Sequence, residues 1–338
     1  MNTAVYAILI AFVANIALCP MLIPSLVKLK FGQFVRTDGP ASHLKKAGTP
    51  TMGGIMIIVS FVLAALIFMR DNPHAVAVVL TTVALGFVGF LDDFIIIKKR
   101  RSEGLTPKQK LFGQVFVAVV FFMCWRTLPG FSGEMLIPFF PDFSFDFMGI
   151  NGLLGSEFSL LGFTPGDLIF GLFVIFIFLS CTNGANLTDG LDGLATGVTA
   201  IIAVFFLFCA WMLDSPLLPV IGAAVGSLMG FLLFNAHPAK VFMGDTGSLA
   251  LGGFIAAIAL MLNMPLFLAI VAIIYVIESL SVIIQIGYFK MTRRRFFKMA
   301  PIHHHFEQSG WPETKVVAFF CVITAMACLL GFLAFQGF

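Results

Sequence analysis

The chain has 338 residues, of which 59% are apolar and 11% are charged. Soluble domains carry roughly 25% charged residues, so this composition excludes a soluble globular protein, a disordered chain and a secreted disulfide scaffold. The six cysteines lie in or beside apolar runs without a CxxC spacing, which is typical of small apolar residues packed within a membrane. We therefore expect an all-α, polytopic integral membrane protein.

Apolar runs long enough to cross a bilayer core of about 30 Å recur along the whole chain. They predict about ten transmembrane helices within a single domain, 1–338. The expected spans are 3–27, 51–69, 74–91, 110–128, 166–182, 194–213, 217–234, 247–263, 265–287 and 315–336. The Gly-, Pro- and Phe-rich stretch 129–165 predicts a long irregular outer segment with room for short strands.

The basic residues predict how these spans are oriented. Of the 20 Lys and Arg residues, all except Arg70 and Arg126 fall on one side of the expected topology. The positive-inside rule makes this side cytoplasmic, so both termini are expected on the outer, periplasmic or extracellular side. The predicted cytoplasmic loops, which also hold most of the unusual polar residues, are 28–50, 92–110, 183–193, 235–247 and 288–314.

The first polar cluster is the segment KKAGTPTMGG at 45–54. Thr51 is placed to cap the following helix, whose free N–H groups could receive an anion beside Lys46. An ordinary basic loop at the membrane interface explains this segment equally well.

Asp92 and Asp93 follow the third expected span. Adjacent residues on a helix point about 100° apart, so the two carboxylates are expected to have different roles. Their proximity could raise one pKa, which would suit a proton acceptor. The alternative is a solvated pair neutralised by Lys98 and Lys99.

Two further clusters are rich in oxygen-bearing side chains. The segment NGANLTDGLDG at 183–193 spaces four such side chains three residues apart, among glycines. Carboxylate and amide oxygens suit Mg²⁺, or the donors of a ribose and a base. In the segment 235–248, Asp245 is either the N-cap of the next helix or a metal ligand, and the two roles are compatible.

The segment Arg293–Trp311 contains three consecutive histidines within PIHHHFE. Neighbouring histidines diverge on a helix or strand, so contacts to phosphate or a nucleotide are favoured over a shared metal ion. The arginines, interleaved with Phe296 and Phe297, are typical of an amphipathic interfacial segment. Glu278 is an acid within the ninth span, and the sequence offers no partner for it.

Together, the KKAGTPTMGG, NLTDGLDG and PIHHHFE segments and the order of the clusters from Lys46 to His305 resemble the polyprenyl-phosphate N-acetylhexosamine-1-phosphate transferases, in particular their muramoyl branch. The resemblance implies transfer of phospho-MurNAc-pentapeptide from UDP-MurNAc-pentapeptide to undecaprenyl phosphate. The products are lipid I, a precursor in peptidoglycan biosynthesis, and UMP. It further implies Mg²⁺ as cofactor, a site facing the cytoplasm in the bacterial plasma membrane, contacts with membrane lipids, a homodimer and no nucleic-acid partner.

The resemblance also implies residue roles. Asp245 would bind Mg²⁺, Asp92 would deprotonate the lipid phosphate or attack directly, and Asp93 would support it. Substrate-binding candidates are Lys46, Thr51, Lys108, Asn183, Asn186, Asp189, Gly190, Leu191, Asp192, Asn235, Phe242, His303, His304 and His305.

Two other functions are weighed against this one. A sister enzyme that transfers GlcNAc-1-phosphate would share the aspartates, and only the His303–His305 segment argues against it. A secondary transporter would place functional charges at the bilayer midplane, where only Glu278 is expected.

Overall fold

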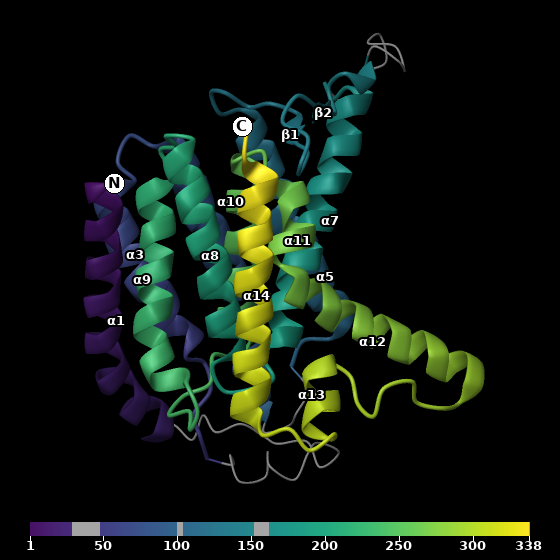
Figure 1. Cartoon of the computed structure of the whole chain (residues 1–338). Helices are drawn as coiled ribbons and strands as arrows, with labels where there is room; N and C mark the ends of the chain where they lie inside the picture. The colour runs from purple at the N-terminus through teal and green to yellow at the C-terminus, as the bar shows by residue number, and fades with distance from the viewer. Residues whose placement is uncertain (29–47, 100–103, 152–161, 338) are drawn as a thin grey trace.

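The chain, in a computed structural model that describes residues 1–28, 48–99, 104–151 and 162–337, is a bundle of long helices with one small two-stranded sheet (Figure 1). Nine of the described helices are long and apolar enough to cross a membrane, and a tenth, shorter apolar helix is α3. The protein is therefore a multi-pass, all-α membrane protein, as the composition predicts. These ten apolar helices are α1 (Asn2–Lys28), α3 (Gly54–Phe68), α4 (Pro73–Lys99), α5 (Pro107–Arg126), α7 (Pro165–Thr188), α8 (Leu194–Met212), α9 (Leu218–Asn235), α10 (Gly244–Met261), α12 (Ile273–Thr292) and α14 (Glu313–Phe335).

Small residues explain how these helices pack. Gly222, Gly226 and Gly230 recur every fourth residue on α9, and all three lie against α1. Because lipid offers no hydrophobic force between helices, such close approach of two backbones is a main source of helix association in membranes. α10, rich in Gly, Ala and Ser, is the most buried of the spanning helices and packs on α3, α4, α7 and α8. The start of α10 is therefore surrounded by other helices.

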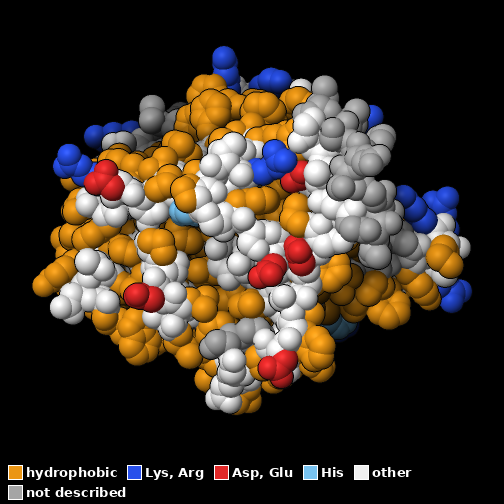
Figure 2. All heavy atoms as spheres, turned by 90° about the horizontal axis from the view of Figure 1, so that it is seen from above, with side chains coloured by type: hydrophobic (Ala, Val, Ile, Leu, Met, Phe, Trp, Pro, Cys, Tyr) orange, Lys and Arg blue, Asp and Glu red, His pale blue; other side chains and the backbone are white. Residues whose placement is uncertain are grey.

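Both chain termini lie at the same end of the bundle (Figure 1). That end also carries the hairpin of β1 (Glu134–Leu136) and β2 (Ser144–Asp146), which pair antiparallel with Met135 opposite Phe145. The expected short strands of the outer segment are thus present. Figure 2 looks onto this end, where acidic side chains stand among hydrophobic and uncharged ones.

The ninth expected span, 265–287, is not one continuous helix. It consists of a 3-10 turn η1 (Pro265–Phe267), a single helical turn α11 (Leu268–Val271), and α12, which begins after Ala272. α12 projects sideways from the bundle (Figure 1). A separate short helix, α13 (Ile302–Glu307), lies beside α12 and the start of α14. The apolar run was correctly located, but its break leaves no signal in hydropathy.

Several helices reach further into the expected loops than the apolar runs do. α4 continues to Lys99 and α7 continues to Thr188, while α10 begins at Gly244. Asp92 and Asp93 therefore stand on a helix, and the segment 183–188 forms the C-terminal end of another. These extensions place polar side chains in rigid positions at the end of the bundle opposite the termini.

Candidate active site

Three carboxylates from two helices meet at this end of the bundle. Asp92 and Asp93 come from α4 and Asp245 comes from the first turn of α10. One oxygen from each lies within 4.8 Å of the others, close enough for all three to hold one metal ion. Asp92 and Asp93 are buried, whereas Asp245 is partly exposed.

The contact between α4 and α10 is made by backbone. A Cβ added to Gly89 would lie 2.6 Å from the Thr246 nitrogen and closer still to the Asp245 carbonyl. Gly54 of α3 lies equally tightly on Gly247. Glycine at these positions lets three helices converge around the start of α10, which fixes where Asp245 begins its helix.

The two neighbouring aspartates have different partners, as their angular separation predicts. Asp93 accepts hydrogen bonds from the backbone N–H groups of Asp245 (3.2 Å) and Thr246 (2.9 Å) and from the Thr246 hydroxyl (2.6 Å). It therefore caps α10 from another helix, where a carboxylate also complements the helix dipole. Asp92 accepts from the Leu105 N–H at 3.0 Å.

This arrangement corrects two cap assignments. Asp245 is not the N-cap of α10, because Met243 holds that position and the Asp93 carboxylate satisfies the free N–H groups. Thr51 does not cap α3, whose N-cap is Gly53. Thr51 is instead buried, with its hydroxyl beside Gly244.

Lys110, which the sequence did not single out, lies within the aspartate cluster. Its ammonium group donates to Asp245 and lies 3.5 Å from Asp92 Oδ1. The expected phosphate contact, Lys108, is exposed on the same helix and outside this ion pair. The sequence contains a signal that distinguishes the two lysines. Thr106 and Gln109 form a capping box that starts α5 at Pro107, so Lys108 and Lys110, two residues apart on a helix, point to different sides of it.

Gln114 lies one helical turn beyond Lys110 and is buried. It exchanges hydrogen bonds with Asn183 of α7, at 3.0 and 3.4 Å, and Asn183 also donates to the Leu179 carbonyl. The Asn183 amide thus joins α5 to α7. Asn186, one turn further along α7, donates to Asp245 Oδ1 at 2.7 Å and to Ser248 at 2.9 Å. It holds the Asp245 carboxylate in one orientation.

The turn after α7 carries the next four candidates. Asp189 is the C-cap of α7, and Leu191 and Asp192 are buried. Burial, followed by the negative charges of Asp245 and Asp93, holds the pKa of the Asp189 carboxyl well above its ordinary value, although the Gly244 N–H acts in the opposite direction.

Asp192 links this turn to two other segments. Its carboxylate accepts from the Ala239 N–H and pairs with His237, both at 3.0 Å, and its own N–H donates to Glu313 at 2.7 Å. Asp192, His237 and Glu313 form the second group of side chains that could hold a metal ion in the described part of the chain. The start of α14 is thereby fastened to the turn.

Asn235 is the last residue of α9, and Phe242 lies in the connection between α9 and α10. The Asn235 amide is buried, accepts from Thr196 at 2.6 Å and donates to the Val241 carbonyl at 3.0 Å, so its contacts are internal. The backbone of Phe242 pairs with Pro50 and Gly53, which brings the segment before α3 beside the start of α10. Lys46 lies outside the described residues.

The three histidines diverge, each toward its own partner. His303 is buried against Glu278 of α12, His304 pairs with Glu307 at 2.7 Å, and His305 Nδ1 accepts from the Lys298 N–H at 3.1 Å. Glu278, for which the sequence offered no partner, has its partner in His303, 25 residues away.

Comparison with known proteins assigns this fold and site to a class. The family model described as Glycosyl transferase family 4 matches residues 75–263, which include the aspartate cluster and the turn after α7. The model described as Phospho-N-acetylmuramoyl-pentapeptide-transferase signature 1 matches residues 46–58. Over more than half its length, the chain thus matches the class described as glycosyl transferase family 4.

Full-length relatives narrow the class. The chain is 45% identical to the phospho-N-acetylmuramoyl-pentapeptide-transferase of Acetivibrio thermocellus over 334 residues, covering 98% of this chain and 95% of the relative. It is 47% identical to that of Clostridium perfringens over 331 residues and 42% identical to that of Staphylococcus epidermidis over 334 residues, each covering 97% of both chains. The chain belongs to the phospho-N-acetylmuramoyl-pentapeptide-transferase family.

Proposed function

We propose that this protein transfers phospho-MurNAc-pentapeptide from UDP-MurNAc-pentapeptide to undecaprenyl phosphate, giving lipid I and UMP, in peptidoglycan biosynthesis. The family to which the chain belongs supports this reaction. The observation that carries it within the molecule is the convergence of Asp92, Asp93 and Asp245 beside Lys110. Transfer of a phosphoryl group between two anions needs this kind of charged, rigid site more than it needs covalent chemistry.

The charge of the cluster favours a divalent cation. When ionised, the three carboxylates and the Lys110 ammonium leave two negative charges uncompensated among the described side chains. Buried charge of this size is costly unless it is matched. Carboxylate oxygens are the ligands that Mg²⁺ prefers, so Asp245 fits as its ligand, with the other two carboxylates within 4.8 Å. Bound there, Mg²⁺ would neutralise the diphosphate of the donor.

The chain's own residues would hold the reacting groups in place. Asp93 fixes the start of α10, Asn186 orients Asp245, and Lys110 supplies a positive charge within the cluster. Asp92 would then take the proton of the lipid phosphate or attack the donor directly, and both routes fit a carboxylate in this position.

The turn Asp189–Asp192 supports a nucleotide pocket beside the cluster. The Asp189 carboxylate lies close enough to Asp245 and Asp93 to interact electrostatically with them. A nucleoside bound at the turn would therefore bring its diphosphate toward the aspartates. Thr51 and Phe242 border the same region through Gly244 and Gly53. His304 and His305 lie on α13, where imidazoles could bind phosphate oxygens or the sugar.

The membrane position of the site follows from the same reasoning. The cluster lies at the bundle end opposite the termini. The expected topology assigns nearly all the Lys and Arg residues of the sequence to the side of the membrane opposite the termini. We infer that this end faces the cytoplasm of the bacterial plasma membrane, where UDP-linked donors are available and a polyprenyl phosphate can approach from the bilayer. The homodimer stays a prediction.

The experiment supplies purified protein in detergent with undecaprenyl phosphate, UDP-MurNAc-pentapeptide and Mg²⁺, and measures UMP and lipid-linked product. We expect UMP only when both substrates are present, and none after EDTA is added. Turnover with UDP-GlcNAc in place of the muramoyl donor would assign the protein to the sister reaction. The absence of UMP with both donors, from folded protein, would contradict the proposal.

A further inference from the structure

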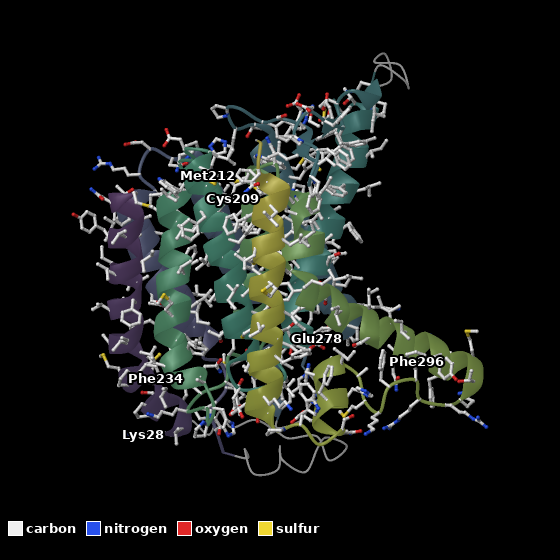
Figure 3. The ribbon with its side chains drawn as sticks, in the orientation of Figure 1. Lys28, Cys209, Met212, Phe234, Glu278 and Phe296 are labelled. Carbon is white, nitrogen blue, oxygen red and sulfur yellow. The ribbon has the colours of Figure 1, made fainter. Side chains whose placement is uncertain are left out.

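Glu278 is a fully buried acid on the projecting helix α12, outside the aspartate cluster. Its two carboxylate oxygens are both used: one lies 2.9 Å from His303 Nδ1, and the other accepts from the Ile302 N–H at 2.9 Å. Figure 3 shows Glu278 beside the short helix α13, which carries both partners. The acid therefore fastens α13 to α12 at one point.

The far edge of the His303 ring lies on the turn after α7. A Cβ added to Gly190 would lie 2.6 Å from His303 Cε1 and closer still to Nε2. Only a residue without a side chain leaves room for the imidazole there, so Gly190 and His303 are sterically matched. A line of direct contacts thus runs from Glu278 through His303 to the Asp189–Asp192 turn.

His303 Nε2 is the one buried side-chain nitrogen or oxygen atom without a hydrogen-bond partner in the described part of the chain. A buried polar atom left unpaired costs about 1–3 kcal/mol. An apolar ring would fill the same space without that cost, so stability alone does not account for histidine at this position. Such an atom points to a functional demand on the contact.

We propose that Glu278 is a positioning residue for the nucleotide pocket, acting through His303 to fix the Asp189–Asp192 turn where a nucleoside diphosphate binds. The identity of the ligand rests on the proposed function, but the mechanical link between α12 and the turn does not. The hydrogen bonds of the Glu278 carboxylate go to α13 and not to the aspartate cluster or to the turn. Its loss therefore weakens nucleotide binding and leaves the chemical step nearly unchanged.

The test compares three variants in detergent. Glu278→Ala removes both hydrogen bonds to α13. Glu278→Gln preserves them, because the amide oxygen accepts from Ile302 N–H and the amide NH₂ donates to His303 Nδ1 once the ring proton moves to Nε2. Ser281→Ala is the matched control: this buried hydroxyl lies on the same helix and donates only to the Glu278 backbone carbonyl.

We expect Glu278→Ala to raise the Kd for UMP and the KM for the UDP-linked donor about tenfold, the usual scale for loss of a partner that orients a binding group. Its kcat should stay within about threefold of the wild type. Glu278→Gln and Ser281→Ala should each have a Kd for UMP and a KM for the donor close to those of the wild type. In a His303→Ala background, Glu278→Ala should add less than about twofold, because both changes break the same link. An unchanged Kd and KM in Glu278→Ala would overturn the proposal, and so would equal losses in the Ala and Gln variants.

Hydrogen exchange provides a readout that needs no substrate. We expect Glu278→Ala to speed amide exchange in residues 189–193 while α8 and α9 keep their wild-type protection. Wild-type protein that binds no UMP would refute the proposed function, yet this exchange pattern would still support the link to the turn. Unchanged exchange at the turn would refute the link itself.

Discussion

The substitution Gly89→Ala tests how α4 packs against α10 without weakening α4 as a helix. Alanine is the better helix former by about 1 kcal/mol, so α4 itself should not be weakened. However, the added Cβ would lie 2.6 Å from the Thr246 backbone nitrogen, where ordinary contact begins near 3.4 Å. Backbone cannot rotate away as a side chain can, so α4 and α10 must separate by about 0.8 Å or more.

A separation of this size acts directly on the aspartate cluster. The bonds from Asp93 to the Asp245 and Thr246 N–H groups measure 3.2 and 2.9 Å, so they would be broken or badly stretched. Misplacement of reacting groups by about 1 Å typically costs on the order of 10²-fold in rate. We therefore expect kcat for UMP release to fall by roughly that factor in Gly89→Ala.

The matched control is Gly86→Ala, one turn earlier on α4. There the closest atom is the end of the flexible Ile58 side chain, and the nearest backbone atom, the Thr246 carbonyl oxygen, lies at 3.4 Å. Its kcat should stay within about threefold of the wild type. Folding of both variants is checked by size-exclusion chromatography and thermal unfolding in detergent. Wild-type kcat in folded Gly89→Ala would refute the claim that this helix crossing sets the geometry of the site.

Three further predictions concern neighbouring side chains. Lys110 contacts the aspartates, whereas Lys108 is exposed. Lys110→Gln should therefore lower kcat at least tenfold, and by more than Lys108→Gln does. An equal loss of kcat in the two variants would assign the phosphate contact to Lys108. Asn183→Ala leaves the buried Gln114 amide unpaired. The free energy of unfolding should therefore fall by about 1–3 kcal/mol, and the unfolding temperature with it, while UMP affinity is kept. An unchanged unfolding temperature with weaker UMP binding would make Asn183 a substrate ligand. Because burial and nearby carboxylates raise the pKa of Asp189 in the fold, the native state holds more protons than the unfolded state above the ordinary carboxyl pKa. In EDTA, the free energy of unfolding should therefore fall as pH rises from about 4 toward neutral, and Asp189→Asn should flatten that fall; an unchanged slope would contradict this account of Asp189.

The sequence predicted features that depend on local composition and failed where distant segments must meet. Apolar runs located all nine described helices that are long and apolar enough to cross a membrane, and the shorter α3, because hydropathy over about 20 residues is sufficient for that. The break at Ala272 was missed, since residues 266–277 around it are apolar throughout and Pro265 stands only at the start of the span. The early ends assigned to α4 and α7 have the same origin: polar residues on a helix look like loop when only hydropathy is considered.

The candidate site shows the same contrast: features set by local sequence were predicted, and contacts between distant segments were not. The density of Asn, Asp and Gly at 183–193 marked the turn after α7, and the divergence of Asp92 and Asp93 followed from helix geometry alone. The pairing of Glu278 with His303 joins two segments whose spacing carries no periodic signal, so only the three-dimensional structure reveals it. The residue type of Thr51 suits a cap of α3, but Gly53 holds that position. Asp245 was a candidate cap of α10, and tertiary packing gave that function to Asp93.

The measurement that tests the metal-centred transferase most directly combines activity and metal binding in Asp245→Ala. Wild-type protein should release UMP only with Mg²⁺ and should bind Mn²⁺ in its place. Folded Asp245→Ala should release no UMP above background and bind Mn²⁺ weakly, because the cluster loses the carboxylate that Asn186 orients. The control Asp146→Ala, an exposed acid in the β1–β2 hairpin, should match the wild type in both assays. Mg²⁺-dependent turnover at the wild-type rate in Asp245→Ala would contradict the assignment of this cluster as the site of phosphoryl transfer.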